Sequence, residues 1–201
     1  MKKTFVISLI FGFLIGLQSL SAQMTTKFNS EIHKNIYRIE VDNYQLVELI
    51  EFKNGEFKGS LNHKVFKLNR KEKIKDSVFN KITIPSKMVQ SLRFNLNIGG
   101  FENLKDCNEI ENCISGLDGT TILFQTVKKD FENNAYYWEL TSDYYYKQND
   151  VELPNEVVKA RRLLSKINEQ FDLNKQFQNF LNRLPNGRYL YGMIIMKKGR
   201  R

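Results

Sequence analysis

Two cysteines are the residues whose type and spacing most clearly indicate chemistry. Cys107 and Cys113 are the only cysteines among the 201 residues. An even pair this close in sequence indicates a disulfide if the protein reaches an oxidising compartment. Structural zinc sites use a tighter spacing and a second ligand pair, and thioredoxin-like motifs use C-x-x-C; neither pattern is present. The pair therefore predicts a structural disulfide, with two free thiols as the alternative.

Acidic residues flank this cysteine pair and could supply oxygen ligands for calcium. They are Asp106, Glu109, Glu111 and Asp118. The segment does not match an EF-hand loop, because Ile110 occupies a ligand position and the required glycine is missing. Asp118 and Gly119 together are typical of a turn. We therefore expect a solvated, turn-forming loop here, with no metal and no cofactor.

The common catalytic signatures are missing from the sequence. It contains no G-x-S-x-G, no S-x-x-K, no H-E-x-x-H and no glycine-rich phosphate-binding motif. A cysteine nucleophile would need a reduced thiol beside His33 or His63, which conflicts with a disulfide. No catalytic residue is assigned, and the sequence favours a non-enzymatic domain that acts through a surface. Two alternatives stay open: a small inhibitor or immunity-like module, and a hydrolase of an envelope polymer in which Asp118 or Glu139 supplies acid and base.

Aromatic residues concentrate between positions 136 and 146. Strand alternation would place Tyr136, Trp138 and Leu140 on one face, and we expect Trp138 to lie in the core. Three adjacent tyrosines follow: Tyr144, Tyr145 and Tyr146. Because three neighbouring rings cannot all face inward, they are candidates for a surface that binds a sugar or a peptide partner.

Basic residues give the chain a formal net charge of +9. They concentrate between Lys64 and Lys81 and again from Lys197 to Arg201. Such a field attracts anionic polymers within a Debye length, although a charged connector around residues 70–76 can also be merely solvated. No basic-aromatic motif of a nucleic-acid reader is present. The expected partner is an anionic envelope polymer or another envelope protein, and not a nucleic acid.

The first 22 residues have the three parts of a secretory signal. Lys2 and Lys3 precede an apolar run from Phe5 to Leu17, and small residues lead to Ala22. The run is shorter than the roughly 20 apolar residues that a membrane-spanning helix needs. We expect cleavage near Ala22, a secreted or periplasmic location, no membrane span after cleavage, and a single domain over residues 23–201.

The elements that must position these residues suggest an α+β fold with a mostly antiparallel sheet. Asn54-Gly55 predicts a hairpin with a type I′ turn, and a second hairpin is expected across residues 132–134. β-branched and aromatic residues predict strands at 36–42, 44–52, 56–68, 77–84, 120–128, 135–146 and 188–196.

Helices are expected in two places. Pro85 and Ser86 open the first, whose apolar residues Val89, Leu92 and Leu96 share one face, and Gly99-Gly100 ends it. The second is a C-terminal helical segment that begins at Pro154 and stops at Pro185. Its apolar stripe predicts a long amphipathic element, which Asp172 and Asn174 divide into two helices.

Four short stretches resemble a group of small secreted proteins of Bacteroidetes-type bacteria. They are GFENLKDC (100–107), Cys113, GLDGTTILFQ (116–125) and YYW (136–138). The signal ending Ser21-Ala22-Gln23 is similar to theirs, and the sharpest part of the likeness is the cysteine pair followed by Asp118-Gly119. The group has no known function, so the resemblance implies export and the disulfide and transfers no catalytic residue.

Overall fold

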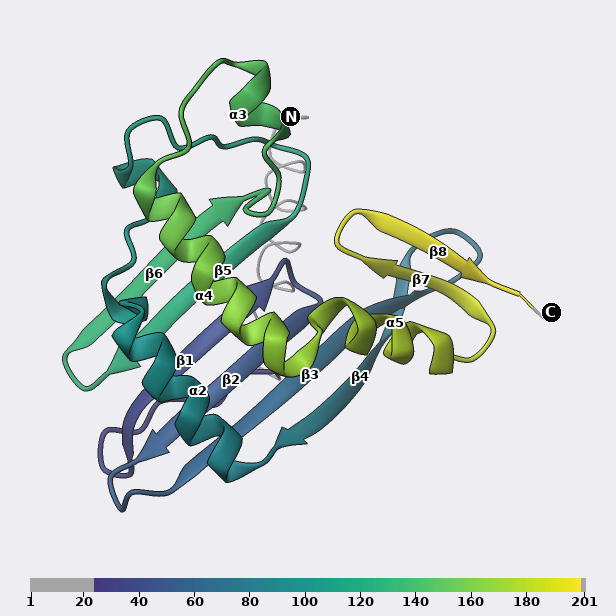
Figure 1. Ribbon diagram of the computed structural model, residues 1–201. Coiled ribbons are helices and arrows are strands. Elements are labelled where there is room, and N and C mark those ends of the chain that lie inside the picture. Colours follow the sequence, from purple (N-terminus) through teal and green to yellow (C-terminus); the bar gives the residue numbers. More distant parts are fainter. Residues whose placement is uncertain (1–23, 200–201) are drawn as a thin grey trace, which may run out of the picture.

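In the computed structural model, which describes residues 24–199, eight strands form one antiparallel sheet and helices cover one of its faces (Figure 1). The predicted α+β class is therefore correct, whereas the predicted signal peptide at 1–22 lies outside the described residues. The strands are β1 (His33–Val41), β2 (Gln45–Phe52), β3 (Phe57–Leu68), β4 (Ile74–Ile84), β5 (Thr121–Lys128), β6 (Phe131–Trp138), β7 (Gly187–Tyr191) and β8 (Ile194–Lys198). The helices are α2 (Ser86–Ile98), α3 (Tyr144–Gln148), α4 (Asn155–Phe171) and α5 (Leu173–Arg183), with short 3-10 turns η1 (Phe101–Asn103) and η2 (Cys107–Glu109).

The long strand β3 joins the two ends of the sheet. The strand order is β6-β5-β1-β2-β3-β7-β8, and β4 also pairs with β3. β2 pairs with residues 57–63 of β3, and β7 pairs with residues 66–68. The C-terminal hairpin therefore pairs with the last residues of β3, which extend past the segment that pairs with β2.

The hairpin of β2 and β3, which was predicted from Asn54-Gly55, confirms the two predicted strands but not the predicted type I′ turn. Gly55 has a φ of 85°, whereas Asn54 does not adopt a positive φ. The Gly55 amide donates to the Phe52 carbonyl at 3.1 Å. A type I turn followed by a left-handed glycine fits this pattern, because only that last position needs the conformation that glycine adopts without strain.

The predicted second hairpin is present as β5 and β6, but its turn lies at Lys129 and Asp130 and not at residues 132–134. Its second strand runs from Phe131 to Trp138, whereas a strand at 135–146 was expected. Asn133 lies inside β6, where its side-chain amide donates to the carbonyls of Glu102 and Leu104. These bonds hold η1 against the strand, which explains why a turn-favouring residue is extended here.

The register of β6 also overturns the prediction that Trp138 lies in the core. Ala135 and Tyr137 face the helices and are buried, and the Tyr137 ring lies edge-on to Phe124 at 5.9 Å. Trp138 and Tyr136 therefore point to the other face of the sheet, because successive side chains of a strand alternate. Trp138 is half-buried, and Tyr136 is 48% exposed.

Two apolar clusters hold the helices against the sheet. In the larger, α2 and α4 pack on β1, β2, β5 and β6 through residues such as Tyr37, Leu92 and Leu163. In the smaller, Phe177 and Phe180 of α5 pack on Val65 of β3. Burying each such side chain contributes about 1.5–3 kcal/mol relative to exposure. These contacts fix the frame on which the functional surfaces are built.

The C-terminal half confirms the predicted helices and corrects the predicted last strand. Asp172, with a φ of 44°, separates α4 from α5, as expected. The single strand predicted at 188–196 is a hairpin, because Gly192 turns the chain with a φ of 51° and β8 follows. Among residues 24–199, no helix is long and apolar enough to span a membrane.

Candidate functional site

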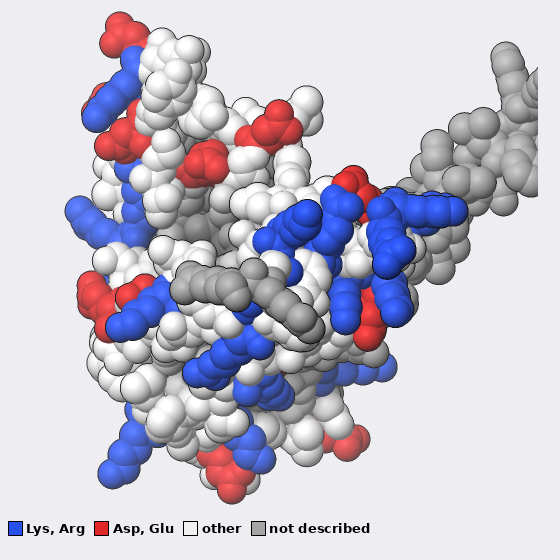
Figure 2. Space-filling view, turned by 90° about the vertical axis from the view of Figure 1, so that its right-hand side faces the viewer, with Lys and Arg blue, Asp and Glu red and all other residues white. Residues whose placement is uncertain are grey.

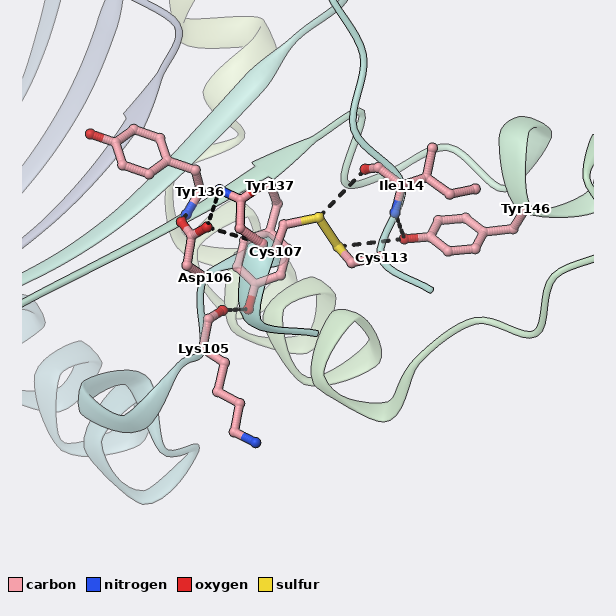
Figure 3. The surroundings of a disulfide bond; sticks show 9 residues. Lys105, Asp106, Cys107, Cys113, Ile114, Tyr136, Tyr137 and Tyr146 are labelled. Carbon is pink, nitrogen blue, oxygen red and sulfur yellow. Dashed lines mark hydrogen bonds between the residues drawn. A yellow bond between two sulfur atoms is a disulfide. The ribbon is translucent and has the colours of Figure 1, made fainter. Parts of the chain in front are cut away.

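The predicted disulfide joins Cys107 and Cys113, whose Cα atoms lie 5.4 Å apart (Figure 3). It closes a short loop beside β6. On one side of the loop, the Asp106 carboxylate accepts hydrogen bonds from the Asn108 and Tyr136 amides. On the other side, the Tyr146 hydroxyl accepts from the Ile114 amide at 3.4 Å. The loop therefore links the strand β6 to the short helix α3.

Replacing both cysteines by serine should lower the free energy of unfolding by about 2 kcal/mol, because a short cross-linked ring no longer restricts the unfolded chain. Urea unfolding of the variant and of the parent protein, with and without reductant, measures this loss. Adding reductant should lower the parent protein to the level of the variant and leave the variant unchanged. An intact mass that does not rise by two hydrogens on reduction would contradict the disulfide itself.

The three candidate tyrosines lie in different surroundings. They fall on α3 rather than on a strand. Tyr144 is 62% exposed, Tyr145 is half-buried, and Tyr146 is buried against the disulfide loop. The first two therefore remain candidates for binding, whereas Tyr146 holds the structure together.

Trp138 joins the two accessible tyrosines in one group of rings. Its ring centroid lies 4.4 Å from that of Tyr145, which in turn meets Tyr144 at 5.1 Å. We call Tyr136, Trp138, Tyr144 and Tyr145 the aromatic surface. Trp138 is fixed in place because its indole N–H donates to the Asp118 carbonyl at 2.7 Å.

Gly119 is the residue that allows this close approach. It has a φ of 129°, and a Cβ there would lie 2.7 Å from both the Trp138 indole nitrogen and a Glu139 carboxylate oxygen. Any other residue would meet both groups and would also be strained. The predicted Asp118-Gly119 turn therefore packs the loop onto the tryptophan.

A cleft of about 460 Å³ adjoins the aromatic surface at Tyr136. Its lining includes Glu40 and Asp42, from the end of β1, and Gly192 and Met193, from the turn of the C-terminal hairpin. Glu139 lies at its border, where its carboxylate accepts from the Thr120 amide at 2.6 Å. We call this site the acidic cleft.

Glu40 and Asp42, which line the acidic cleft, have raised pKa values. Burial raises the pKa of Glu40, and the charges of Lys64 and Arg38 only partly offset this effect. Burial also raises the pKa of Asp42, against a hydrogen bond from the Thr121 amide, and the negative charge of Glu139 raises it further. Perturbed carboxylates in a concave site are common where proteins bind or transform ligands.

Asp118 and Glu139, the two carboxylates that the sequence suggested for a hydrolase, lie in different surroundings. Glu139 stands beside Asp42, close enough to influence its pKa, whereas Asp118 is exposed on the turn and contributes its backbone carbonyl to Trp138. The structure therefore brings Glu139 near Asp42, the residue that directly follows β1. Among residues 24–199, no three His, Cys, Asp or Glu side chains are grouped so that they could hold a metal ion.

Part of the predicted basic cluster gathers at the far end of β3 and β4. Lys64 is instead buried on β3, and Lys81 pairs with Asn62 nearer the other end of the two strands. Figure 2 views the molecule from the side of the gathered cations, where Lys and Arg outnumber Asp and Glu. Arg188 of β7 joins the group because β7 pairs with β3, and it forms an ion pair with Glu72. The exposed cations of the β3–β4 turn and its flanks are Arg70, Lys71, Lys73 and Lys75. We call this region the basic end.

Sequence reasoning missed Glu40 and Asp42. One signal was present in the sequence: Glu40 and Asp42 are two residues apart and follow the apolar residues Ile36 and Ile39. This spacing places two carboxylates on the same face at the end of the predicted strand. What could not be foreseen is that β5 and β6 lie beside this strand end. No protein-family model matches the chain, and no curated protein matches it.

Proposed function

We propose that the protein is an exported, non-catalytic binding domain that holds a glycan of the cell envelope in the acidic cleft and against the aromatic surface. The observation that carries the proposal is the continuity of the two features. Tyr136 lines the cleft and lies two residues from Trp138 on the same face of β6. From there the rings of Tyr145 and Tyr144 continue the surface.

The chemistry of these groups suits a sugar. Carboxylates accept hydrogen bonds from neighbouring hydroxyl groups, and bonds to an ionised acceptor are stronger than neutral ones. Tyr and Trp offer large rigid faces with a polar tip, onto which the apolar face of a sugar ring can stack. A cleft of about 460 Å³ has room for a small number of sugar units. Export, predicted from residues 1–22, would place the domain beside such polymers.

Binding to isolated envelope glycan tests the proposal. In a cosedimentation assay with purified peptidoglycan, Tyr136→Ala and the double variant Tyr144→Ala/Tyr145→Ala should each bind at least tenfold more weakly. Loss of a central aromatic contact commonly costs about 2 kcal/mol or more. Phe131→Ala is the matched control, because Phe131 is also an exposed ring of β6 but lies outside the cleft. If the Tyr136 variant and the control bind as tightly as the parent protein, the proposed surface is wrong.

A second candidate function, hydrolysis of the same polymer, is favoured by the raised pKa values of Glu40 and Asp42. Glycoside hydrolases pair one protonated and one ionised carboxyl group across the bond that they cleave. Release of reducing ends from peptidoglycan distinguishes the two functions. Release that both Glu40→Gln and Asp42→Asn abolish would replace the non-catalytic proposal, and release no greater than that from boiled protein would remove the hydrolase.

The basic end favours an anionic partner as a further contact. Exposed Lys and Arg there attract a negatively charged polymer or protein, and added salt screens this attraction. Capture from an envelope extract at low and at high salt therefore separates the two surfaces. A partner held by the basic end, including the target of an inhibitor-like module, should be released by salt, whereas glycan in the acidic cleft should be retained.

A further inference from the structure

A groove of about 660 Å³ lies over β2, β3 and β4, on the face of the sheet opposite α2. Its lining includes Glu48 and Ile50 of β2 and Ser60 of β3. These side chains point away from α2, because their neighbours Leu49 and Leu61 pack in the core with that helix and successive side chains of a strand alternate. We call this site the open-face groove. Among the described residues, it shares no lining residue with the acidic cleft.

The pairing of the strands sets the order of groups along the groove. Glu48 pairs with Ser60, and Ser60 pairs with Thr83, so these three side chains form one row across the sheet. Ile50 and Lys58 form the next row towards the turn between β2 and β3. Paired residues of antiparallel strands lie on the same face of the sheet, so all five side chains face the groove.

The end of the groove nearest that turn is apolar. Ile50 and Phe52 line it, together with Pro85, where β4 leads into α2. The Lys58 ammonium lies 5.0 Å from the centroid of the Phe52 ring, which brings its aliphatic stem to the same end. Glu48 and Phe52 are four residues apart on β2, so the groove runs for roughly 14 Å at the rise of a β-strand.

The opposite end of the groove carries accessible polar groups. Lys81 and Thr83 of β4 are exposed, and Lys81 pairs with Asn62, one row beyond Thr83. Within residues 24–199, the Lys81 ammonium forms no ion pair and the Thr83 hydroxyl forms no hydrogen bond. Because an ammonium and a hydroxyl group both donate hydrogen bonds, this end can hold an anion.

Glu48 leaves the positive charge of the groove uncompensated. It is only 2% exposed, and its oxygens accept from the Thr26 amide at 2.9 Å, from the Thr26 hydroxyl at 2.6 Å and from Arg38 Nε at 2.9 Å. Arg38 therefore balances the charge of Glu48. In the part of the chain that the structure describes, Lys58 and Lys81 have no carboxylate partner, so the groove favours an anion over a cation.

We propose that the open-face groove binds a fatty acid of medium chain length. The carboxylate accepts from the Lys81 ammonium and the Thr83 hydroxyl, and the hydrocarbon chain runs over Ile50 towards Phe52 and Pro85. An extended chain gains about 1.2 Å per bond, so roughly twelve carbons span the groove. Its volume is that of a typical ligand pocket, with a mainly apolar lining and a few placed polar groups.

Calorimetric titration of the purified protein with fatty acids below their micelle concentrations tests this assignment. Each methylene group that leaves water for an apolar site should tighten binding about fourfold. Dodecanoate should therefore bind at least tenfold more tightly than octanoate. Dodecyltrimethylammonium has the same chain with the opposite charge and should bind at least tenfold more weakly than dodecanoate. Equal affinities within either pair, or no binding of dodecanoate at millimolar concentration, would overturn the proposal.

A matched pair of charge reversals locates the carboxylate. Lys81→Glu should weaken the binding of dodecanoate at least tenfold, because an attractive charge becomes a repulsive one. Lys75→Glu makes the same change at another exposed lysine of β4 that lies outside the groove, and it should bind like the parent protein. An equal loss in the two variants would show that only the overall charge attracts the fatty acid, which would contradict the proposed site.

A bulky side chain in the groove tests where the hydrocarbon chain lies. Thr83→Trp puts a large ring at an exposed strand position that tolerates aromatic residues, and it should abolish dodecanoate binding by filling the groove. A circular dichroism spectrum like that of the parent protein would confirm that this variant folds. A folded variant that still binds dodecanoate normally would overturn the proposal. So would a parent protein that sediments as a dimer when this variant is a monomer, since the groove would then be an interface between two copies.

Discussion

Replacing Glu51 by alanine is expected to destabilise the protein by about 3–5 kcal/mol, because it leaves the buried guanidinium of Arg93 without its counterion. Among residues 24–199, Arg93 forms no ion pair with a second carboxylate, and Glu102 is only near enough for the charge of Arg93 to contribute to its lowered pKa. The guanidinium also lies over the face of the Tyr37 ring. The Asn35 side-chain amide would lose its acceptor in the same step. Denaturant unfolding at pH 7 measures the effect.

Two comparisons separate this cost from the loss of an ordinary surface charge. The Lys34 side chain, the other partner of the Glu51 carboxylate, is 62% exposed. Lys34→Ala should therefore lower the free energy of unfolding by less than about 1 kcal/mol. The double variant Glu51→Leu/Arg93→Met should recover most of the stability, since apolar residues of similar size can replace a buried ion pair. A loss below about 1 kcal/mol for Glu51→Ala, or a double variant less stable than that single variant, would contradict the buried-charge argument.

Local patterns predicted the first four strands and the main helices because each pattern agrees with its surroundings. Val89, Leu92 and Leu96 are buried, as the helical spacing required. The same helix also contained an overlooked signal, because Arg93 stands inside this apolar stripe. A charged residue on a buried face needs a partner, and here the partner comes from β2, more than 40 residues earlier.

Prediction failed where the pairing of distant segments decides the outcome. Tyr136, Tyr137 and Trp138 are all compatible with either face of a strand, so alternation alone could not fix which rings are buried. The pairing of Phe124 with Ala135 settles the register, and a shift by one residue would reverse every side chain of β6. The acidic cleft could not be predicted from local patterns either, because its lining comes from the end of β1, from β6 and from the turn of the C-terminal hairpin.

Acidification between pH 7 and pH 5 is expected to lower the free energy of unfolding by about 2 kcal/mol through His63 alone. Burial lowers the pKa of this histidine from 6.5 to about 4. The ring is fully buried and stacks on Phe180 at a centroid distance of 5.5 Å. Its Nε2 lies 3.1 Å from the Gln45 side-chain nitrogen, which also donates to the Leu173 carbonyl. Nε2 must therefore accept a hydrogen bond, as only the neutral ring can.

The sign follows from which state takes up the proton. The unfolded chain protonates His63 below about pH 6.5, whereas the folded protein resists protonation until about pH 4, so the stabilising effect is complete above pH 6.5 and is lost as the pH falls towards 4. His63→Gln can be less stable at every pH, but it should lose about 2 kcal/mol less than the parent protein between pH 7 and pH 5. The difference between the two pH dependences removes the contributions of the carboxylates and of His33, because both proteins share them. An NMR titration adds an independent measurement: a His63 ring signal that shifts with a midpoint near pH 6.5 in the folded protein would show that the ring is accessible to protons and that this source of acid sensitivity is wrong.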